Sequence, residues 1–505
     1  MRPLLALRGL SRQRCCYSTI TKPHTASTGS SPSSATTTQD RGPLRIAVLG
    51  SGPAGFYTAL RAVQKYPNTH VHMYEAQPTP YGLVRYGVAP DHPEVKNCQE
   101  KFATLSTHSP SFRFLGNVSI GTDIPLPLLQ SAYNAIILSY GASQDRTLGI
   151  PGETTLANVV PARDFVGWYN SFPLCANKGP KLSEVEDVVI VGQGNVALDV
   201  ARVLLSNVDD LRGTDMSEAA LEELSRSRVK RVRIVGRRGV CQGAFQIKEV
   251  RELMALKNVG FIPPQDLDQL MPSDLSTLPR QQKRLMELML KGGSAGPVEK
   301  TWGMDFCLSP TSFNGDASGR LQSVTFRRNA LSPNPFEKDA RAVAIEPEET
   351  VTMEAQLAFR SIGYKSIPIP STEQVGLPFN SKNGTIPNQA GRILSSDEEG
   401  GKPMPGWYCA GWVKRGPTGV IASTMMDAFD TAETLVSDWV SGKPFLEGEG
   451  GWEKVREGMS EEARGKRVVE WEDWRVIEGE ERRRGRKISS LEEMLRVVDE
   501  AKGRA

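Results

Sequence analysis

The most regular pattern in the chain is a short apolar run followed by a glycine-rich turn and a helix-like segment. The run Leu44–Leu49 predicts a parallel strand that is buried on both faces. The turn GSGPAG follows at residues 50–55, and residues 56–64 have the periodicity of a helix. A further strand is predicted at residues 70–74, directly before Glu75. This order of strand, glycine turn, helix and strand predicts a dinucleotide-binding unit.

Each glycine of this turn has its own expected role. Gly50 permits the tight turn, Gly52 lets the backbone approach a pyrophosphate, and Gly55 lets the helix pack closely on the strand. The helix N-terminus adds free N–H groups and a positive dipole end. Glu75 is placed to accept hydrogen bonds from ribose hydroxyls. We expect an anionic dinucleotide here; the alternative is a structural turn beside a surface glutamate.

The same pattern occurs a second time. The apolar segment Asp187–Val191 predicts a strand, the turn GQGNVA follows at residues 192–197, and Asn195–Leu205 predicts a helix. Ala197 replaces the third glycine, a change that this fingerprint tolerates. Two such units in one chain predict two nucleotide cofactors and an electron path between them.

The residues after the next strand distinguish the second site from the first. A polar, charged insertion at residues 209–228 precedes the strand predicted at 232–235, and Arg237 and Arg238 follow that strand. An acidic residue there would repel a 2′-phosphate, whereas two guanidinium groups hold it with charge-assisted hydrogen bonds. We therefore predict NADP in preference to NAD; the alternative is a solvated basic turn.

A third segment predicts another helix N-terminus that faces a cofactor. Residues 356–364 predict a strand and a glycine turn, and residues 407–410 predict a second strand. A loop rich in glycine and proline leads from there to a long helix at residues 420–439. The N–H groups of Val420 and Ile421 would stabilise negative charge on a reduced isoalloxazine. The first nucleotide is therefore expected to be FAD.

Composition bounds the class of protein. The chain has 505 residues, which suggests two to three domains at about 150 residues each. No apolar run approaches the ~20 residues of a membrane span, and a net charge of +3 gives no reason to propose nucleic acid. Residues 1–40 carry arginine, serine and threonine and no acidic side chain before Asp40. This is typical of a mitochondrial transit peptide, the alternative being a disordered tail.

The cysteines exclude an internal redox pair. No Cys-x-x-Cys motif and no zinc or iron–sulfur ligand set occurs, so we expect no metal site and free, mostly buried thiols. The seven cysteines are Cys15, Cys16, Cys98, Cys175, Cys241, Cys307 and Cys409. Electrons must therefore leave the flavin for an external acceptor.

Several motifs together resemble the adrenodoxin reductase family of NADPH-dependent ferredoxin reductases. These motifs are GSGPAGFYTA, YGLVRYGVAPDHPEVKN, GQGNVALDVAR, GRRG and AGWVKRGPTGVIA. The resemblance extends over residues 45–439. Many related flavoenzymes place an Asp after the last Ala-Gly pair, whereas this chain has Trp412 there, as the family does.

The resemblance implies contacts with both cofactors. For FAD it implies Ala54, Glu75, Leu83, Val118, Trp412, Gly419, Val420 and Ile421. For NADP it implies Gln193, Gly194, Asn195, Val196, Arg237, Arg238, Glu249 and Gly419. It also implies a polar relay of His92 and Asp199 near the flavin. The alternatives are that His92 orders the loop 89–93 and that Asp199 forms a structural salt bridge.

A basic helix is predicted at residues 279–290, with Arg280 and Arg284 on one face. The family uses arginines at the matching positions to dock an acidic ferredoxin. We therefore expect a transient, salt-sensitive complex at this face, to which Lys283 adds. From the residues alone, the alternative is a solvated helix face.

The predicted domain order is a transit peptide (1–40), a split FAD domain (41–145 and 371–440), an inserted NADP domain (146–370) and a charged extension (441–505). The extension contains the run EERRRGRK and departs from the family pattern. We expect it to be helical and to wrap the surface; a partly disordered tail or a second docking surface are the alternatives.

The expected fold class is α/β, with two Rossmann-like domains, the NADP domain inserted into the FAD domain. The resemblance implies hydride transfer from NADPH to FAD and single-electron transfer to a 2Fe–2S ferredoxin that serves a cytochrome P450 or iron–sulfur cluster assembly. The expected location is the mitochondrial matrix, free or peripheral on the inner membrane. The alternatives are a relative of the glutamate synthase small subunit, which would bring iron–sulfur cysteines, and a non-catalytic redox sensor that binds FAD and NADP.

Overall fold

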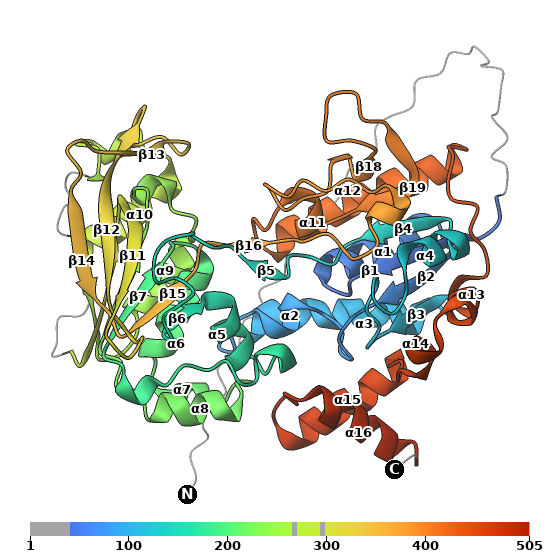
Figure 1. Ribbon diagram of the computed structural model, residues 1–505, viewed down its shortest axis with the longest axis horizontal. Helices are drawn as coiled ribbons and strands as arrows, with labels where there is room; N and C mark the ends of the chain where they lie inside the picture. The colour runs from blue at the N-terminus through green and yellow to red at the C-terminus, as the bar shows by residue number, and fades with distance from the viewer. Residues whose placement is uncertain (1–40, 265–269, 293–297, 504–505) are drawn as a thin grey trace, which may run out of the picture. The chain divides into compact units, whose positions relative to one another are not determined.

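The computed structural model describes residues 41–503, except 265–269 and 293–297 (Figure 1). The predicted transit peptide at residues 1–40 lies outside these residues. No helix in the described ranges is both long enough and apolar enough to cross a membrane.

The first sheet contains the first glycine turn. Its strand order is β17-β18-β19-β4-β1-β2-β3, and β19, β4, β1, β2 and β3 pair in parallel. The bounds are β1 Leu44–Leu49, β2 Thr69–Tyr74, β3 Phe112–Leu115, β4 Ala135–Leu138, β17 Asn388–Gln389, β18 Arg392–Leu394 and β19 Pro403–Cys409. Helices α1 (Pro53–Lys65), α3 (Cys98–His108) and α4 (Leu126–Ala132) connect them. β1 and its predicted bounds are confirmed, and α1 begins three residues earlier than predicted because Pro53 suits the first turn of a helix.

The second sheet is parallel throughout, in the order β6-β15-β7-β8-β10-β9. Its strands are β6 Val159–Pro161, β7 Asp187–Val191, β8 Arg231–Val235, β9 Val259–Ile262, β10 Lys300–Asp305 and β15 Leu357–Arg360. Its helices are α5 Ala162–Tyr169, α6 Asn195–Leu205, α7 Val208–Leu211, α8 Glu218–Ser225, α9 Ile247–Met254 and α10 Arg280–Lys291. Helices α7 and α8 lie in the insertion predicted to be a polar stretch. Leu211 in α7, Ala220 in α8 and Met216 between them are buried.

An antiparallel sheet follows β10 and was not predicted. It consists of β11 (Leu308–Gly315), β12 (Leu321–Ser332), β13 (Arg341–Ala344) and β14 (Thr350–Glu354). Phe313, Val324 and Phe326 form a buried cluster with residues of β6, β15, β7 and β8 of the second sheet. Residues 316–320 connect β11 and β12.

Two short strands join the two parallel sheets. β5 (Gln144–Asp145) follows the first sheet and pairs with β16 (Tyr364–Lys365), where the chain returns from the second (Figure 1). The chain therefore leaves the first sheet after β4, completes the second, and comes back to add β17 to β19. This arrangement confirms the predicted fold class of one dinucleotide-binding unit inserted into another.

The C-terminal extension is helical, as expected. It forms α13 (Gly451–Gly458), α14 (Glu461–Gly465), α15 (Trp471–Arg484) and α16 (Leu491–Ala501), drawn in red in Figure 1. Trp474, Ile477 and Met494 are fully buried in the core cluster that also contains β1 and α1. The alternative of a disordered tail is wrong for residues 441–503, because these apolar side chains complete the core of the first sheet.

Candidate functional site

The first glycine turn has the geometry predicted from its three glycines. Gly50 has φ +104°, and a Cβ there would lie 2.6 Å from the Cα of Tyr140. A Cβ on Gly55 would lie 2.2 Å from the carbonyl oxygen of Gly50. A Cβ on Gly52 would meet nothing within 4 Å. The turn is thus closely packed at its two ends and open in the middle, where a pyrophosphate would approach the backbone.

Glu75 lies beside this turn at the end of β2. Its carboxylate accepts hydrogen bonds from the Ser51 N–H (3.0 Å) and hydroxyl (2.7 Å) and from the Gln77 N–H (3.1 Å). Burial raises the pKa of Glu75, while these hydrogen bonds act in the opposite direction. Val118 is buried next to it and donates its N–H to the Glu75 carbonyl oxygen. The structure therefore brings Glu75 and Val118, two of the predicted FAD contacts, to the same end of the first sheet.

The long helix after β19 begins near the first turn. It is α12 (Ile421–Val440), with Val420 as its N-cap. α12 runs parallel to α1, since Tyr57 contacts the Phe429 ring and Arg61 forms an ion pair with Glu433 one turn further along both helices. The N-termini of the two helices therefore point toward the same region, and both favour negative charge there.

The loop between β19 and α12 returns to the first turn. A Cβ on Gly411, whose φ is +75°, would lie 2.5 Å from the Cβ of Ala54. Trp412 follows in α11 (Trp412–Arg415), and its ring centroid lies 5.6 Å from that of Tyr364. Asp427 accepts the Gly411 N–H (2.6 Å) and so fixes this loop against α12. Asp427 was not predicted, because an acidic residue inside a helix carries no motif of its own.

The second glycine turn repeats the geometry of the first. Gly192 has φ +118°, and a Cβ there would lie 2.1 Å from the Ser361 carbonyl oxygen, whereas a Cβ on Gly194 would meet nothing within 4 Å. The Gln193 side chain donates to the Asp305 carbonyl oxygen (2.7 Å), and Asn195 accepts the N–H of Gln246 (2.9 Å). Both predicted contact side chains therefore fix the turn itself. Val196 is half-buried beside them.

Arg237 and Arg238 lie directly after β8, as predicted. Arg237 is exposed and Arg238 is half-buried. Burial and the neighbouring Arg237 lower the pKa of Arg238. Among the described residues, no carboxylate lies within 4 Å of either guanidinium. Arg233, which lies four residues before Arg237 in β8, is instead paired with Asp305. Two adjacent arginines without an acidic partner are suited to a phosphate.

A buried arginine connects the residues of the predicted relay. Arg202 is 3% exposed, and its guanidinium lies 2.7 Å from Asp91, 2.8 Å from Asp199 and 3.0 Å from Nδ1 of His92. Its Nη1 also lies 3.2 Å from Glu249. No hydrogen bond or ion pair joins His92 directly to Asp199 in the described part of the chain. The salt bridge expected as the alternative for Asp199 is present.

The contacts of His92 define its tautomer. A guanidinium offers only donors, so Nδ1 of His92 accepts from Arg202 and Nε2 carries the proton that it donates to Glu252 (2.9 Å). Burial raises the pKa of Asp199, and burial together with the charge of Asp199 raises that of Glu249. Carboxylates with raised pKa values beside a histidine are typical of functional sites. Arg202 and Glu252 were not predicted, although both lie near predicted residues.

The same cluster contains a group with metal-ligand chemistry. One ligand atom from each of His92, Glu249 and Glu252 lies within 4.8 Å of the others. Arg202 lies 3.2 Å from Glu249 and 3.5 Å from Glu252. The guanidinium already supplies the positive charge that these carboxylates require, so the group is better explained as an ion-pair network than as a metal site.

Arg280 and Arg284 lie on the exposed face of α10, as predicted. The opposite face buries Leu285, Met286 and Met289, and Gln282 donates to the Cys241 carbonyl oxygen. Neither arginine pairs with a carboxylate of a described residue. The two charges are thus held on a packed helix and remain available to a partner.

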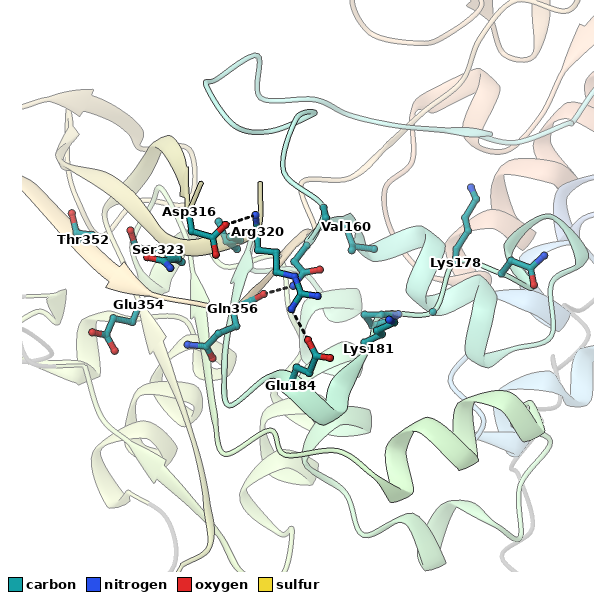
Figure 2. A pocket seen from close by; sticks show the side chains of 17 residues that line it. Val160, Lys178, Lys181, Glu184, Asp316, Arg320, Ser323, Thr352, Glu354 and Gln356 are labelled. Atoms are coloured by element: carbon teal, nitrogen blue, oxygen red, sulfur yellow. Dashed lines mark hydrogen bonds and ion pairs between the residues drawn. The ribbon is translucent and has the colours of Figure 1, made fainter. Parts of the chain in front are cut away.

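A separate cavity of about 960 Å³ lies between the loop before β7 and the strands β12 and β14 (Figure 2). Arg320 points toward Glu184 at 2.6 Å across it. Its lining includes none of the predicted site residues. Described thiols are free, and Cys175, Cys241 and Cys409 are buried while Cys98 and Cys307 are half-buried.

Comparison with known proteins agrees with this arrangement. Residues 44–257 match the family model of pyridine nucleotide-disulphide oxidoreductases. The human mitochondrial NADPH:adrenodoxin oxidoreductase is 43% identical, over 91% of this chain and 93% of its own length. The Salvelinus fontinalis protein of the same name is also 43% identical, over 90% and 91%. FprA from Mycobacterium tuberculosis in complex with NADPH has a TM-score of 0.79 at 36% identity, over 90% of this chain and 99% of its own.

These matches correct one expectation about the C-terminal extension. Residues 1–439 alone could not account for 91% of the chain, so the match with the human protein continues beyond residue 439. The extension was predicted to depart from the family, because its charged surface positions obscured the apolar positions that complete the core. The identities over nine tenths of the chain show that this protein belongs to the NADPH:adrenodoxin oxidoreductase family.

Proposed function

We propose that this protein is an FAD-dependent NADPH:ferredoxin reductase of mitochondria, with FAD in the first site and NADPH in the second. The observation that carries the proposal is the pair of open glycine turns, one next to Glu75 and one next to Arg237 and Arg238. The similarity to NADPH:adrenodoxin oxidoreductases supports a ferredoxin as the electron acceptor. The fold supports a division into an FAD-binding part, residues 41–145 and 371–440, and an NADP-binding part, residues 146–370.

The residues around the first turn fit FAD. The space at Gly52 would admit the pyrophosphate, and the N-termini of α1 and α12 would stabilise its charge. The remaining proposed contacts come from both halves of this part of the chain. They are Ala54, Glu75, Leu83, Val118, Trp412, Gly419, Val420 and Ile421.

The residues around the second turn fit NADP. The space at Gly194 would admit the pyrophosphate, and Arg237 and Arg238 would hold the 2′-phosphate. Gln193, Asn195 and Val196 shape the turn, and Glu249 and Gly419 complete the proposed contacts. The absence of a described carboxylate near the two arginines supports NADP in preference to NAD.

When bound, FAD takes up an electron pair as hydride and releases electrons singly, which protein side chains cannot do. The chain's contribution is to position the two nucleotides. Arg202 contacts both His92 and Asp199, and it cannot pass a proton between them because a guanidinium does not release its protons. We therefore propose that His92 and Asp199 order the site, with Arg202 fixing both.

The acceptor is proposed to dock at α10. Arg280 and Arg284 are exposed and lack described partners, so they would attract an acidic ferredoxin. Such a complex would be transient and salt-sensitive, because exposed charges are screened within about 8 Å at physiological ionic strength. Residues 1–40 support a matrix location, either free or peripheral on the inner membrane.

Anaerobic stopped-flow absorbance of the purified flavoprotein tests the electron path. We expect NADPH to bleach the flavin rapidly, NADH to bleach it far more slowly, and an oxidised 2Fe–2S ferredoxin to restore the colour. Bleaching without reoxidation by any one-electron acceptor would favour a redox sensor. A purified protein without flavin would contradict the reading of the first site.

The variant Arg284→Glu tests the docking surface. A reversed charge at an exposed interface position lowers the association rate most at low salt, so ferredoxin reduction at low salt should fall about tenfold. Reduction of ferricyanide, which needs no docked protein, is the internal reference. Unchanged ferredoxin reduction at low salt would remove α10 from the proposal.

A further inference from the structure

A buried ion pair joins the C-terminal extension to α2 (Leu83–Tyr86), the helix beside the first glycine turn. Arg85 in α2 and Glu481 in α15 are each 7% exposed at the side chain. Nη2 of Arg85 lies 2.6 Å and 2.7 Å from the two carboxylate oxygens of Glu481. Glu481 also accepts the N–H of Ile488 (2.9 Å), which folds the chain back after α15. The extension therefore holds α2 through an ion pair that is almost completely buried.

Helix α2 in turn lies against the first glycine turn. The N–H of Tyr81 donates to the Ser51 carbonyl oxygen (3.0 Å), and a Cβ on Gly82 would lie 3.3 Å from the Cα of Gly52. Tyr81 has φ +84°, a conformation that a residue with a side chain holds only when its surroundings enforce it. Leu83, a proposed FAD contact, follows directly. A displacement of α2 would therefore also displace Leu83 and disturb the first glycine turn.

The same part of the extension also contacts the second nucleotide-binding region. Lys487 is 7% exposed, and its Nζ donates to the Arg85 carbonyl oxygen (2.9 Å) and pairs with Asp215 (2.8 Å). Asp215 lies between α7 and α8 of the second region and also pairs with Lys96 (2.7 Å). One lysine therefore joins α2 to a loop that belongs to the other sheet.

We propose that Glu481 and Lys487 are positioning residues that fix α2 against the first glycine turn and join it to the Asp215 loop, and so set the two nucleotide sites relative to each other. Glu481 and Lys487 are together called the C-terminal bracket below. The proposed consequence for electron transfer rests on the proposed function. The contacts of the bracket with α2 and with Asp215 do not rest on the proposed function.

The charges of the bracket support a positioning role. Among the residues that the structure describes, the three cations Arg85, Lys96 and Lys487 pair with two carboxylates, Glu481 and Asp215. Burial and the charge of Lys96 lower the pKa of Lys487 to about 7. An excess of buried positive charge is unfavourable for stability by itself. Its presence at this junction is explained if the ion pairs select one arrangement of the two regions.

The first experiment measures FAD release on heating, by flavin fluorescence, in the full-length protein with FAD bound. Asp215→Asn is compared with Asp210→Asn, which neutralises an exposed carboxylate of the same insertion. We expect Asp215→Asn to release FAD at a lower temperature and Asp210→Asn to behave as wild type. Equal release temperatures for the two variants would overturn the proposal, because Asp215 lies in the other region and the bracket is proposed to link it to α2.

The second experiment measures the rate constant of flavin reduction at saturating NADPH by anaerobic stopped flow. Lys487→Met is compared with Arg483→Gln, which removes one charge from a side chain that is 72% exposed in the same segment. We expect Lys487→Met to be slower by at least about tenfold, since a misplacement of ~1 Å can lower a rate by ~100-fold. Arg483→Gln is expected to stay within about twofold of wild type. Equal rate constants for the two variants would overturn the proposal.

A double-mutant cycle separates positioning from general destabilisation. If Lys487 acts through Asp215, the double variant Lys487→Met, Asp215→Asn should be no slower than the slower single variant. Multiplicative effects would overturn the link. Should Lys487→Met not retain FAD, Lys487→Arg and Asp215→Asn provide the same comparison with the fold intact. Failure of wild type itself to react with NADPH would reject the proposed function, while the FAD-release comparison would still test the bracket.

Discussion

The two glycine turns have nearly the same backbone but very different surroundings. Ser51, Ala54 and Gly55 of the first turn are buried, and the N-terminal end of α2 and the loop before α12 lie against it. Residues 192–196 of the second turn are all half-buried. This difference in burial fits the proposed function, in which the first site retains FAD and the second binds and releases NADP(H). In that proposal, the burial of the turn and not its glycine pattern distinguishes the resident cofactor from the substrate.

The two sites also differ in the charge at one equivalent position. Glu75 follows the second strand of the first unit, and Arg237 and Arg238 follow the second strand of the second unit. A carboxylate there accepts from ribose hydroxyls, whereas guanidinium groups hold a 2′-phosphate. In the proposed function, this one structural position selects the nucleotide in each unit.

The largest expected effect breaks the first turn itself. Gly55→Ala places a Cβ 2.2 Å from a backbone oxygen that cannot move aside, so we expect no folded, yellow protein. Gly52→Ala is the matched control, because its Cβ meets nothing within 4 Å. It should fold by circular dichroism yet contain little FAD. A Gly52→Ala protein with full FAD content would show that the open space at Gly52 is not where the nucleotide binds.

The next effect concerns Arg202, which connects the surroundings of the two turns. Arg202→Met leaves Asp91, Asp199 and Glu249 without their cation, so the free energy of unfolding should fall by about 3–5 kcal/mol. Chemical denaturation measures this loss. Arg212→Met removes an exposed ion pair with Asp209 and should change the stability by less than about 1 kcal/mol. Similar losses of unfolding free energy in the two variants would show that the buried ion pairs of Arg202 contribute no more than one exposed pair.

A smaller effect tests the charge difference between the two sites. Arg238→Gln removes one proposed phosphate contact, so KM for NADPH should rise by about 10- to 100-fold, corresponding to ~1.5–3 kcal/mol, with KM for NADH little changed. Arg233→Gln is the control, because Arg233 is already paired with Asp305. Steady-state ferricyanide reduction with each nucleotide provides both constants. A parallel rise for NADH would show that Arg238 does not recognise the 2′-phosphate.

The smallest effect is an acid sensitivity of the first region. Burial lowers the pKa of His72 to about 4, and its Nδ1 accepts the N–H of Trp452 (3.2 Å). Below about pH 6.5 His72 is protonated in the unfolded chain, whereas in the folded protein it stays neutral down to about pH 4. The free energy of unfolding therefore falls as the pH falls through this window. From pH 7.5 to 5.5 this amounts to about 1 kcal/mol. His72→Gln should lose that part of the pH dependence, and an unchanged dependence would refute it.

Much of the fold could be predicted from local patterns. The bounds of β1, β7 and α6 follow from continuous apolar runs and from the glycines between strand and helix, and both are local signals. The antiparallel sheet β11 to β14 was missed, because its half-exposed strands alternate weakly between apolar and polar residues. The C-terminal extension was assigned to the surface, because charged residues outnumber the few buried ones that attach it to the core.

The sequence by itself determined two nucleotide-binding units, their order, and the opposite charges of Glu75 and of Arg237 with Arg238. These depend on glycine geometry and on residues at fixed offsets from a strand. Only the tertiary structure decided which of these residues meet. Arg202 contacts both His92 and Asp199. Asp427 fixes the loop of Trp412, and Lys487 joins α2 to Asp215. Such contacts join residues far apart in the chain, and a buried charge acquires its role from the partners that folding brings within hydrogen-bond distance.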